Sequence, residues 1–211
     1  MDGVLVDSEP LHKRAKELAF GEFGLHFPPS TYDSYKGRPD TTMFREVLAD
    51  KSVEEIAELL HRKHQIFEKN EHELQPIPGA VDFVLWAAAH YRLALATSAT
   101  PRNREAMLKL LGIGDRFEAM VDTSRFQRPK PDPEIFLIAM GDLGLGPADC
   151  WIIEDSIAGI RAARAAGCFA VALTTTFDAG ALREAGADAV VASFAELREK
   201  LESLLPRTGG S

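Results

Sequence analysis

The sequence predicts an α/β protein with a doubly wound parallel sheet and an inserted all-helical domain. In the second part of the chain, short apolar segments with β-branched residues alternate with segments that carry apolar residues at helical spacing. This rhythm is typical of right-handed βαβ units, whose helices cover both faces of a parallel sheet. A stretch without strand signals interrupts the pattern. We therefore expect a core made of residues 1–11 and 79–211 and a helical domain over residues 12–78.

The core elements follow from this alternation. Each expected helix is followed by a glycine, which favours a helix C-terminus because it adopts the left-handed conformation easily. The expected strands are Leu93–Ala96, Ala119–Val121, Trp151–Ile153, Ala170–Leu173 and Ala189–Val191. The expected helices are Arg102–Leu111, Pro133–Leu143, Ile157–Ala166 and Ala179–Ala185, and the glycines after them are Gly112, Gly144, Gly167 and Gly186.

The insert contains only helical patterns. Pro76, Pro78 and Gly79 mark the return of the chain to the core, because proline and glycine interrupt regular structure. The expected helices of the insert are Leu11–Phe23, Thr41–Leu48 and Val53–Asn70.

Composition and charge exclude several classes of function. The 211 residues include 24 Lys and Arg against 32 Asp and Glu, a net charge of −8, which is the wrong sign for nonspecific binding to nucleic acid or an anionic membrane. No apolar run is long enough to span a bilayer and no secretory signal pattern opens the chain, so we expect a cytoplasmic protein. Nothing in the sequence suggests an obligate partner, so we expect a monomer. Cys150 and Cys168 lack zinc-ligand or disulfide spacing, and both are expected to be reduced core residues.

Polar residues follow apolar segments at four places where a parallel sheet gathers its ligands, the carboxyl ends of its strands. A Glu-Asp pair supplies the hard oxygen ligands that Mg²⁺ prefers, and a lysine stiffened by two prolines balances anionic charge. A hydroxyl beside backbone N–H groups binds phosphate oxygens. The sequence therefore predicts phosphoryl chemistry with magnesium. The four places are Asp2-Gly3, Thr97-Ser98, Lys130 and Glu154-Asp155.

These motifs, taken in order, resemble those of the haloacid dehalogenase superfamily, in its β-phosphoglucomutase-like and sugar-phosphatase branch with a helical cap. The segment Asp2–Pro10 is similar to the first motif of the family. Thr97 is similar to the second motif, Lys130 to the third and Glu154-Asp155 to the fourth. Each motif alone is weak, and the combination with a helical insert after the first one is specific.

The resemblance implies how the acidic residues act. The first motif of the family reads Asp-x-Asp-Gly, in which the first Asp attacks phosphorus and the second is the general acid/base. Asp2 stands at the second position and Met1 at x, so the nucleophile and its core strand precede residue 1. We expect a truncated functional parent rather than a damaged gene product, because loss of a central strand exposes two strand edges. A metal site would comprise Glu154, Asp155 and the carbonyl of Asp2.

The resemblance also implies substrate contacts. Thr97, the amide of Ser98 and Lys130 clamp the phosphoryl group, and a chain that begins at Met1 cannot accumulate aspartyl-phosphate. His12 and Lys63 fall where related enzymes place residues for closure or substrate contact.

One loop of the insert departs from the family pattern. Lys36-Gly37-Arg38 resembles a cap loop that reads substrate, but the arginine that mutases use for a distal phosphate is replaced, with Asp40 nearest to its place. This departure favours hydrolysis over mutase activity.

Each motif also has an ordinary structural interpretation. The Glu154-Asp155 pair can cap the following helix, as can Thr97 and Ser98 for another helix. Lys130 can be a solvated loop lysine, and His12 a surface or packing residue.

Taken together, the sequence predicts a Mg²⁺-dependent phosphatase that acts on a small phosphorylated metabolite, a sugar phosphate. Two alternatives stay open: a phosphoglucomutase-like isomerase, and a non-catalytic protein that binds a phosphorylated metabolite. No nucleic acid, membrane or obligate protein partner is expected.

Overall fold

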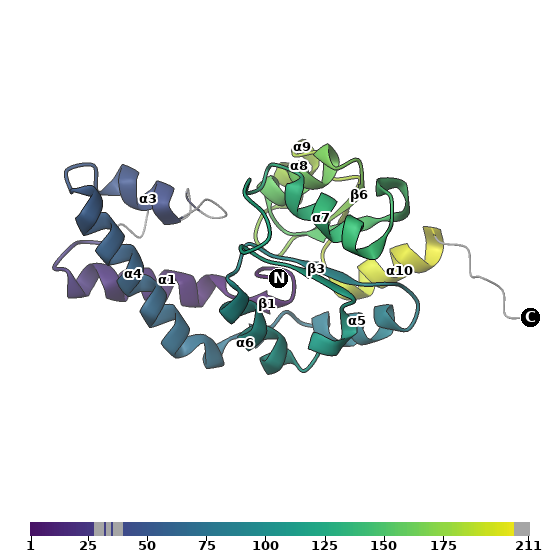
Figure 1. Ribbon diagram of the computed structural model, residues 1–211, viewed down its shortest axis with the longest axis horizontal. Helices are drawn as coiled ribbons and strands as arrows, with labels where there is room; N and C mark the ends of the chain where they lie inside the picture. Colours follow the sequence, from purple (N-terminus) through teal and green to yellow (C-terminus); the bar gives the residue numbers. More distant parts are fainter. Residues whose placement is uncertain (28–31, 33–34, 36–39, 205–211) are drawn as a thin grey trace, which may run out of the picture. The chain divides into compact units, whose positions relative to one another are not determined.

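The computed structural model describes residues 1–27, 32, 35 and 40–204, and the chain divides into two compact units (Figure 1). The core unit comprises Met1–Val6 and Pro76–Ser211, and the helical unit comprises Asp7–Gln75. The sequence predicted an insert over residues 12–78, and in the structure the helical unit begins and ends a few residues earlier.

The core unit contains two parallel sheets, which confirms the predicted α/β class. In the larger sheet β6 lies between β5 and β7, and four consecutive residues of β6, Ala170–Leu173, are fully buried. Such continuous burial is typical of a strand covered by helices on both faces. The strands are β3 (Ala94–Ala96), which pairs with β4 (Ala119–Val121), and β5 (Trp151–Glu154), β6 (Phe169–Leu173) and β7 (Ala189–Val191).

Each strand of these sheets is followed by a helix, as the alternation predicted. In Figure 1, α7 lies on one side of β3 and α5 on the other. The helices α5 and α10 were not among the predicted elements. The helices of the core unit are α5 (Ala80–Ala88), α6 (Pro101–Leu111), α7 (Glu134–Leu143), α8 (Ile157–Ala165), α9 (Ala179–Glu184) and α10 (Phe194–Leu204), with short 3-10 turns at η3 (Gly114–Arg116) and η4 (Pro147–Asp149).

The ends of these helices are set by local hydrogen bonds. Thr100 caps α6 and Asp178 caps α9, and each side chain accepts the backbone N–H three residues further on, at 3.2 and 3.0 Å. At the other end, Gly112 ends α6 and Gly144 ends α7 with φ angles of +66° and +65°. The structure therefore confirms these two glycines as helix stops.

The helical unit is held by an aromatic core. The ring of Phe20 packs edge-on against Phe27 and Phe44, with centroids 5.4 and 5.2 Å apart. The longest helix begins with a capping box, in which Ser52 and Glu55 each accept the other's backbone N–H. Over the described residues of this unit, the helices with given bounds are α1 (Glu9–Glu22), α3 (Asp40–Val47) and α4 (Val53–Asn70), followed by the 3-10 turn η2 (Glu71–Glu73).

The chain crosses between the units at two short strands, β1 (Val6–Asp7) and β2 (Gln75–Pro76), which pair with each other.

Over the described ranges, no helix combines the length and the apolar character that crossing a membrane requires. Both cysteines are free, and Cys168 is buried as predicted. Cys150, which directly precedes β5, is partly buried and packs against the hydrophobic core, so its expected core position is confirmed in part.

Candidate active site

Two carboxyl groups stand at the carboxyl end of β5, where the strand ends and α8 begins. Glu154 and Asp155 are 5% and 8% exposed. Ser156 caps α8 by accepting the amide of Gly159 at 3.0 Å, and its hydroxyl donates to Glu154 Oε2, also at 3.0 Å. A Cβ atom on Gly159 would lie 2.0 Å from Glu154 Oε2. The turn therefore holds the Glu154 carboxylate in a space that only glycine leaves open.

Lys130 neutralises the negative charge of Glu154. Its Nζ forms an ion pair with Glu154 Oε1, and its side chain is only 15% exposed. Burial raises the pKa of Glu154, but the charge and the hydrogen bond of Lys130 outweigh burial and leave that pKa below its usual value. Lys130 is therefore partly buried and ion-paired, and not a solvated loop lysine.

Asp155 is held by a hydroxyl group. The hydroxyl of Thr176 donates to Asp155 Oδ2 at 2.5 Å. Burial, together with the charge of Glu154, raises the pKa of Asp155 to about 6. Thr176 was not among the predicted site residues. Three consecutive threonines directly after β6, at the same end of the sheet as Glu154, were the signal that could have indicated it.

The first motif lies directly against Asp155. Gly3 has a φ angle of +66°, and a Cβ atom there would lie 1.9 Å from Asp155 Oδ2. The hydroxyl of Thr175 donates to the carbonyl of Gly3. Asp2, which precedes this glycine, is half-buried and forms a parallel bridge with Val6. Three segments that are far apart in the chain, 2–3, 154–155 and 175–176, therefore meet at one place.

Thr97 and Ser98 follow β3 in the other sheet. Thr97 is 2% exposed, and its amide donates to the carbonyl of Val121 at 2.9 Å. Its hydroxyl accepts the amide of Ala99 at 3.1 Å, whereas Ser98 is exposed. The cap of α6 is Thr100, so Thr97 and Ser98 are not the caps of that helix. Within the described part of the chain, neither residue has a hydrogen bond to Lys130 or to the two carboxylates.

His12 and Lys63 belong to the helical unit, on α1 and α4. The structure brings them together: Lys63 Nζ lies 2.9 Å from His12 Nδ1, and the imidazole stacks on the ring of Phe67 with centroids 4.3 Å apart. Lys63 is 1% exposed and also forms an ion pair with Asp40 at 2.7 Å. The predicted cap-loop residues, Lys36-Gly37-Arg38, lie outside the described residues.

The donor set of the acidic pair fits Mg²⁺. No group of three or more His, Cys, Asp and Glu side chains arranged for a metal occurs among the residues that the structure describes. Mg²⁺ does not require one, because it binds one or two carboxylates and completes its shell with water and substrate phosphate. Asp155 is buried beside the charged Glu154, which raises its pKa, and a bound divalent cation would offset the charge of both carboxylates.

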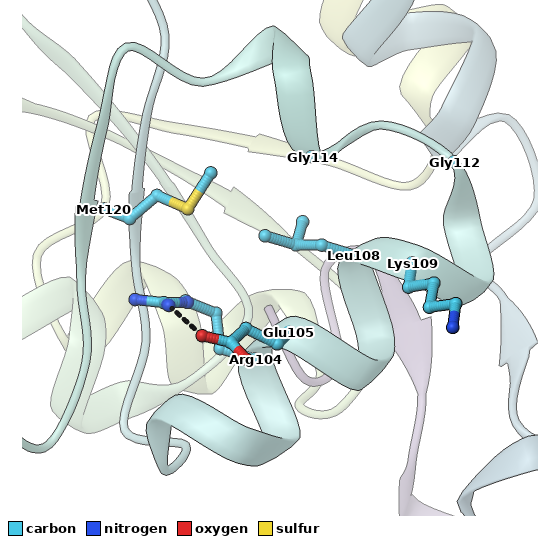
Figure 2. A pocket seen from close by; sticks show the side chains of 7 residues that line it. All are labelled: Arg104, Glu105, Leu108, Lys109, Gly112, Gly114 and Met120. Atoms are coloured by element: carbon cyan, nitrogen blue, oxygen red, sulfur yellow. Dashed lines mark hydrogen bonds and ion pairs between the residues drawn. The ribbon is translucent and has the colours of Figure 1, made fainter.

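A separate hollow of about 380 Å³ lies beside α6 (Figure 2). Leu108 and Met120 face it from α6 and β4, and Arg104 and Glu105 form an ion pair at its edge. None of the predicted site residues lines this hollow, so its shape does not define the candidate site.

Comparison with known proteins identifies the family. A family model described as haloacid dehalogenase-like hydrolase matches residues 1–173. The chain belongs to this family. Among related haloacid dehalogenase-like hydrolases, the phosphorylated carbohydrates phosphatase of Thermotoga maritima is 32% identical over 198 residues, covering 90% of this chain and 91% of the relative. The β-phosphoglucomutase of Bacillus subtilis is 32% identical over 180 residues, covering 81% and 79%.

A solved structure shares the fold of this haloacid dehalogenase-like hydrolase. CbbY from Rhodobacter sphaeroides, solved in complex with phosphate, has a TM-score of 0.79 and 28% identity, with 93% of both chains covered. These relatives place the chain in the β-phosphoglucomutase and sugar-phosphatase branch. The order of the sequence motifs predicted this branch correctly.

Proposed function

We propose that this haloacid dehalogenase-like hydrolase is a Mg²⁺-dependent phosphatase that acts on a small phosphorylated metabolite, a sugar phosphate. The observation that carries the proposal is the convergence of Gly3, Asp155 and the Glu154–Lys130 ion pair in the core unit. The sugar-phosphate class is supported by the relative from Thermotoga maritima, whose name is phosphorylated carbohydrates phosphatase.

The acidic residues have two proposed roles, metal binding and proton transfer. Glu154, Asp155 and the carbonyl of Asp2 would hold Mg²⁺, which supplies positive charge at the phosphoryl oxygens when it is bound. The side chain of Asp2 protonates the leaving oxygen and then accepts a proton from the attacking water. The nucleophile is proposed to be the first Asp of the family motif; Met1 stands at the motif's x position, so this Asp would directly precede Met1.

The remaining residues are proposed to bind and orient the substrate. Thr97 and the amide of Ser98 donate hydrogen bonds to the phosphoryl group, and Lys130 supplies a fixed positive charge. The helical unit is proposed to be the cap domain of the family. In that unit, His12 and Lys63 are proposed to contact substrate.

A mutase is the second candidate, because the β-phosphoglucomutase of Bacillus subtilis is as similar to the chain, at 32% identity, as the phosphatase from Thermotoga maritima. A phosphoglucomutase-like enzyme forms isomer faster than it releases phosphate and depends on a bisphosphate activator. A protein that only binds the metabolite shows neither reaction.

The test measures phosphate release from a panel of sugar phosphates, with Mg²⁺ or with EDTA. It uses two proteins: the 211-residue chain, and the same chain preceded by an apolar strand that ends in Asp. We expect Mg²⁺-dependent release by the longer protein. Isomer formation that exceeds phosphate release supports the mutase, and Mg²⁺-dependent binding of the sugar phosphate without turnover in either protein supports a non-catalytic role.

A further inference from the structure

A buried carboxylate that the proposed mechanism does not use lies at the carboxyl end of β4. Asp122 directly follows this strand and is 1% exposed, less than Glu154 or Asp155. Its Oδ1 accepts the amide of Ser124 at 2.9 Å and the hydroxyl of the same serine at 2.6 Å. Its Oδ2 forms an ion pair with Nη1 of Arg104. Asp122 therefore joins the turn after β4 to the first turn of α6.

Backbone hydrogen bonds on either side of Asp122 hold the segment that follows β3. The amide of Thr97 donates to the carbonyl of Val121 at 2.9 Å, and the amide of Thr123 donates to the carbonyl of Ala99 at 3.2 Å. The bond from Asp122 Oδ1 to the amide two residues on is an Asx turn, which fixes the backbone around Thr123. The turn at Asp122 is therefore bonded to the segment of Thr97 at two points.

These bonds lead on to the hydroxyl of Thr97. The amide of Ala99 donates to Thr97 Oγ1 at 3.1 Å, and Thr97 is only 2% exposed. Because the oxygen of this hydroxyl accepts a hydrogen bond, its hydrogen can be donated to a further acceptor, such as a phosphoryl oxygen. Asp122 thus fixes, through Thr123 and Ala99, the direction of a proposed phosphate-binding group.

Arg104 attaches the other end of this segment. Helix α6 begins directly after Thr100, whose carbonyl accepts the amide of Arg104 at 2.9 Å. Burial raises the pKa of Asp122, but the hydrogen bonds from Ser124 and the charges of Arg104 and Arg125 outweigh burial and leave that pKa below its usual value. Asp122 is therefore charged at neutral pH, and the segment between β3 and α6 is attached to it at both ends.

We infer that Asp122 and Arg104 are positioning residues for the phosphoryl-binding segment of Thr97 and Ser98. They act through this segment and not on the substrate: they hold the Thr97 hydroxyl and the Ser98 amide where both can donate to the phosphoryl group. The role rests on the proposed function, in which these two donors bind the substrate. Donors that are fixed in advance lose less freedom when the substrate binds, so loosening the segment weakens binding.

The test variant combines Asp122→Asn with Arg104→Met. Removal of one partner alone would leave the other charge buried and unpaired, which is strongly destabilising, whereas removal of both leaves no such charge. Asparagine keeps an oxygen for the Ser124 amide, and methionine can pack on Leu108 and Met120, which line the hollow beside Arg104 (Figure 2). This variant loses the connection to α6. A second variant, Asp122→Ala with Arg104→Met, also loses the Asx turn and should show the larger effects.

The first readout is amide hydrogen exchange, measured by NMR in the 211-residue protein. The amides of Thr97, Ala99 and Thr123 should exchange at least about tenfold faster in the first variant. The amides of β6 report unfolding of the whole core and should keep their rates. Unchanged exchange in the segment, or the same acceleration in the segment and in β6, would overturn the inference.

Glu118→Gln is the matched control, because Glu118 lies at the other end of β4 and pairs with Arg92 at the surface. Its exchange rates should equal those of the unaltered protein. If neither double variant folds, Arg104→Lys is measured instead, because it keeps a cation near Asp122 and lacks the guanidinium. It should accelerate exchange in the segment less than tenfold, and rates equal to those of the unaltered protein would overturn the inference.

The second readout is kinetic and uses the protein that carries the first Asp of the motif. KM for a sugar monophosphate should rise several-fold in the double variant, a change that a smaller fraction of folded enzyme does not produce, because it lowers only the apparent kcat. An unchanged KM would overturn the positioning role alone. Absence of phosphate release by the unaltered longer protein contradicts the proposed function instead, and the exchange rates still decide whether Asp122 and Arg104 hold the segment.

Discussion

Glu154 and Asp155 are neighbours in the chain and equally inaccessible to solvent, yet their carboxyl groups differ in acidity. The ion pair with Lys130 keeps Glu154 charged, whereas Asp155 has the hydroxyl of Thr176 as its partner and a pKa raised to about 6. A buried carboxyl that loses its proton beside another carboxylate costs stability in the metal-free protein. Asp155 is thus a residue whose ionised form is destabilising until a cation is bound.

This difference predicts the behaviour of Asp155→Asn. The folded-state pKa lies above the ordinary value of about 3.9, so the folded state retains the proton longer and the stability of the unaltered protein falls as pH rises from about 4 through 6. Asparagine cannot ionise and still accepts the Thr176 hydroxyl. In EDTA at pH 8 we expect the variant to have a higher free energy of unfolding, by about 1–3 kcal/mol.

Urea denaturation between pH 4 and 8 measures this difference, which should vanish toward pH 4. Added Mg²⁺ should stabilise the unaltered protein more than the variant. An Asn variant that is less stable than the unaltered protein at pH 8 in EDTA contradicts this account of Asp155.

A pair of helix glycines gives a second prediction at this scale. Alanine is a better helix former than glycine by up to about 1 kcal/mol, and Gly141 in α7 has open space around its missing Cβ. Gly159→Ala should instead destabilise the protein, because its Cβ would lie 2.0 Å from Glu154 Oε2. We expect opposite signs in thermal unfolding: a gain of about 0.5–1 kcal/mol for Gly141→Ala and a loss of at least about 1 kcal/mol for Gly159→Ala. If both Gly141→Ala and Gly159→Ala stabilise the protein, Gly159 does not pack closely against Glu154.

The elements of the core show how far local sequence determines the fold. Strands such as Ala119–Val121 and Ala189–Val191 have the predicted bounds, because short apolar runs between helices and glycines have few alternatives. Helix α5 was missed because its sequence is apolar almost throughout and shows no helical period. Helix α10 could have been predicted, because the apolar residues Phe194, Leu197 and Leu201, which are buried in the structure, recur at helical spacing.

The contact among α1, α3 and α4 predicts a pH dependence. The pKa of Asp40 is lowered in the folded state by Lys63 and Lys16, although burial opposes them, so its contribution to stability is fully present above about pH 4 and is lost as pH falls further. We expect Asp40→Asn to cost about 3–5 kcal/mol at neutral pH, the range found for breaking a buried ion pair. The difference in the free energy of unfolding between the unaltered protein and Asp40→Asn, measured by urea denaturation, should become smaller below pH 4. A difference that becomes larger on acidification contradicts this role of Asp40.

The sequence indicated the residues of the candidate site, but not the groups that contact them in the folded protein. Asp2, Lys130, Glu154 and Asp155 were recognisable because carboxylates and a lysine followed apolar segments in a family order. The residues that contact them could not be recognised, because they come from other segments of the chain that only folding brings close. Thr176, whose hydroxyl donates to Asp155, is an example. The same holds in the helical unit, where sequence analysis treated Asp40 as a replaced arginine and the structure shows it between Lys16 and Lys63.

We propose that the acidic pair of the core unit supports Mg²⁺-dependent phosphate release. The most direct test is the initial rate of phosphate release from a sugar monophosphate as Mg²⁺ is titrated. It is measured for the protein that carries the first Asp of the motif and for its Asp155→Asn variant. We expect turnover that EDTA abolishes, and an apparent Mg²⁺ affinity at least about tenfold weaker in the variant. Release of phosphate at the same rate in EDTA, or with the same Mg²⁺ dependence in both proteins, would contradict it.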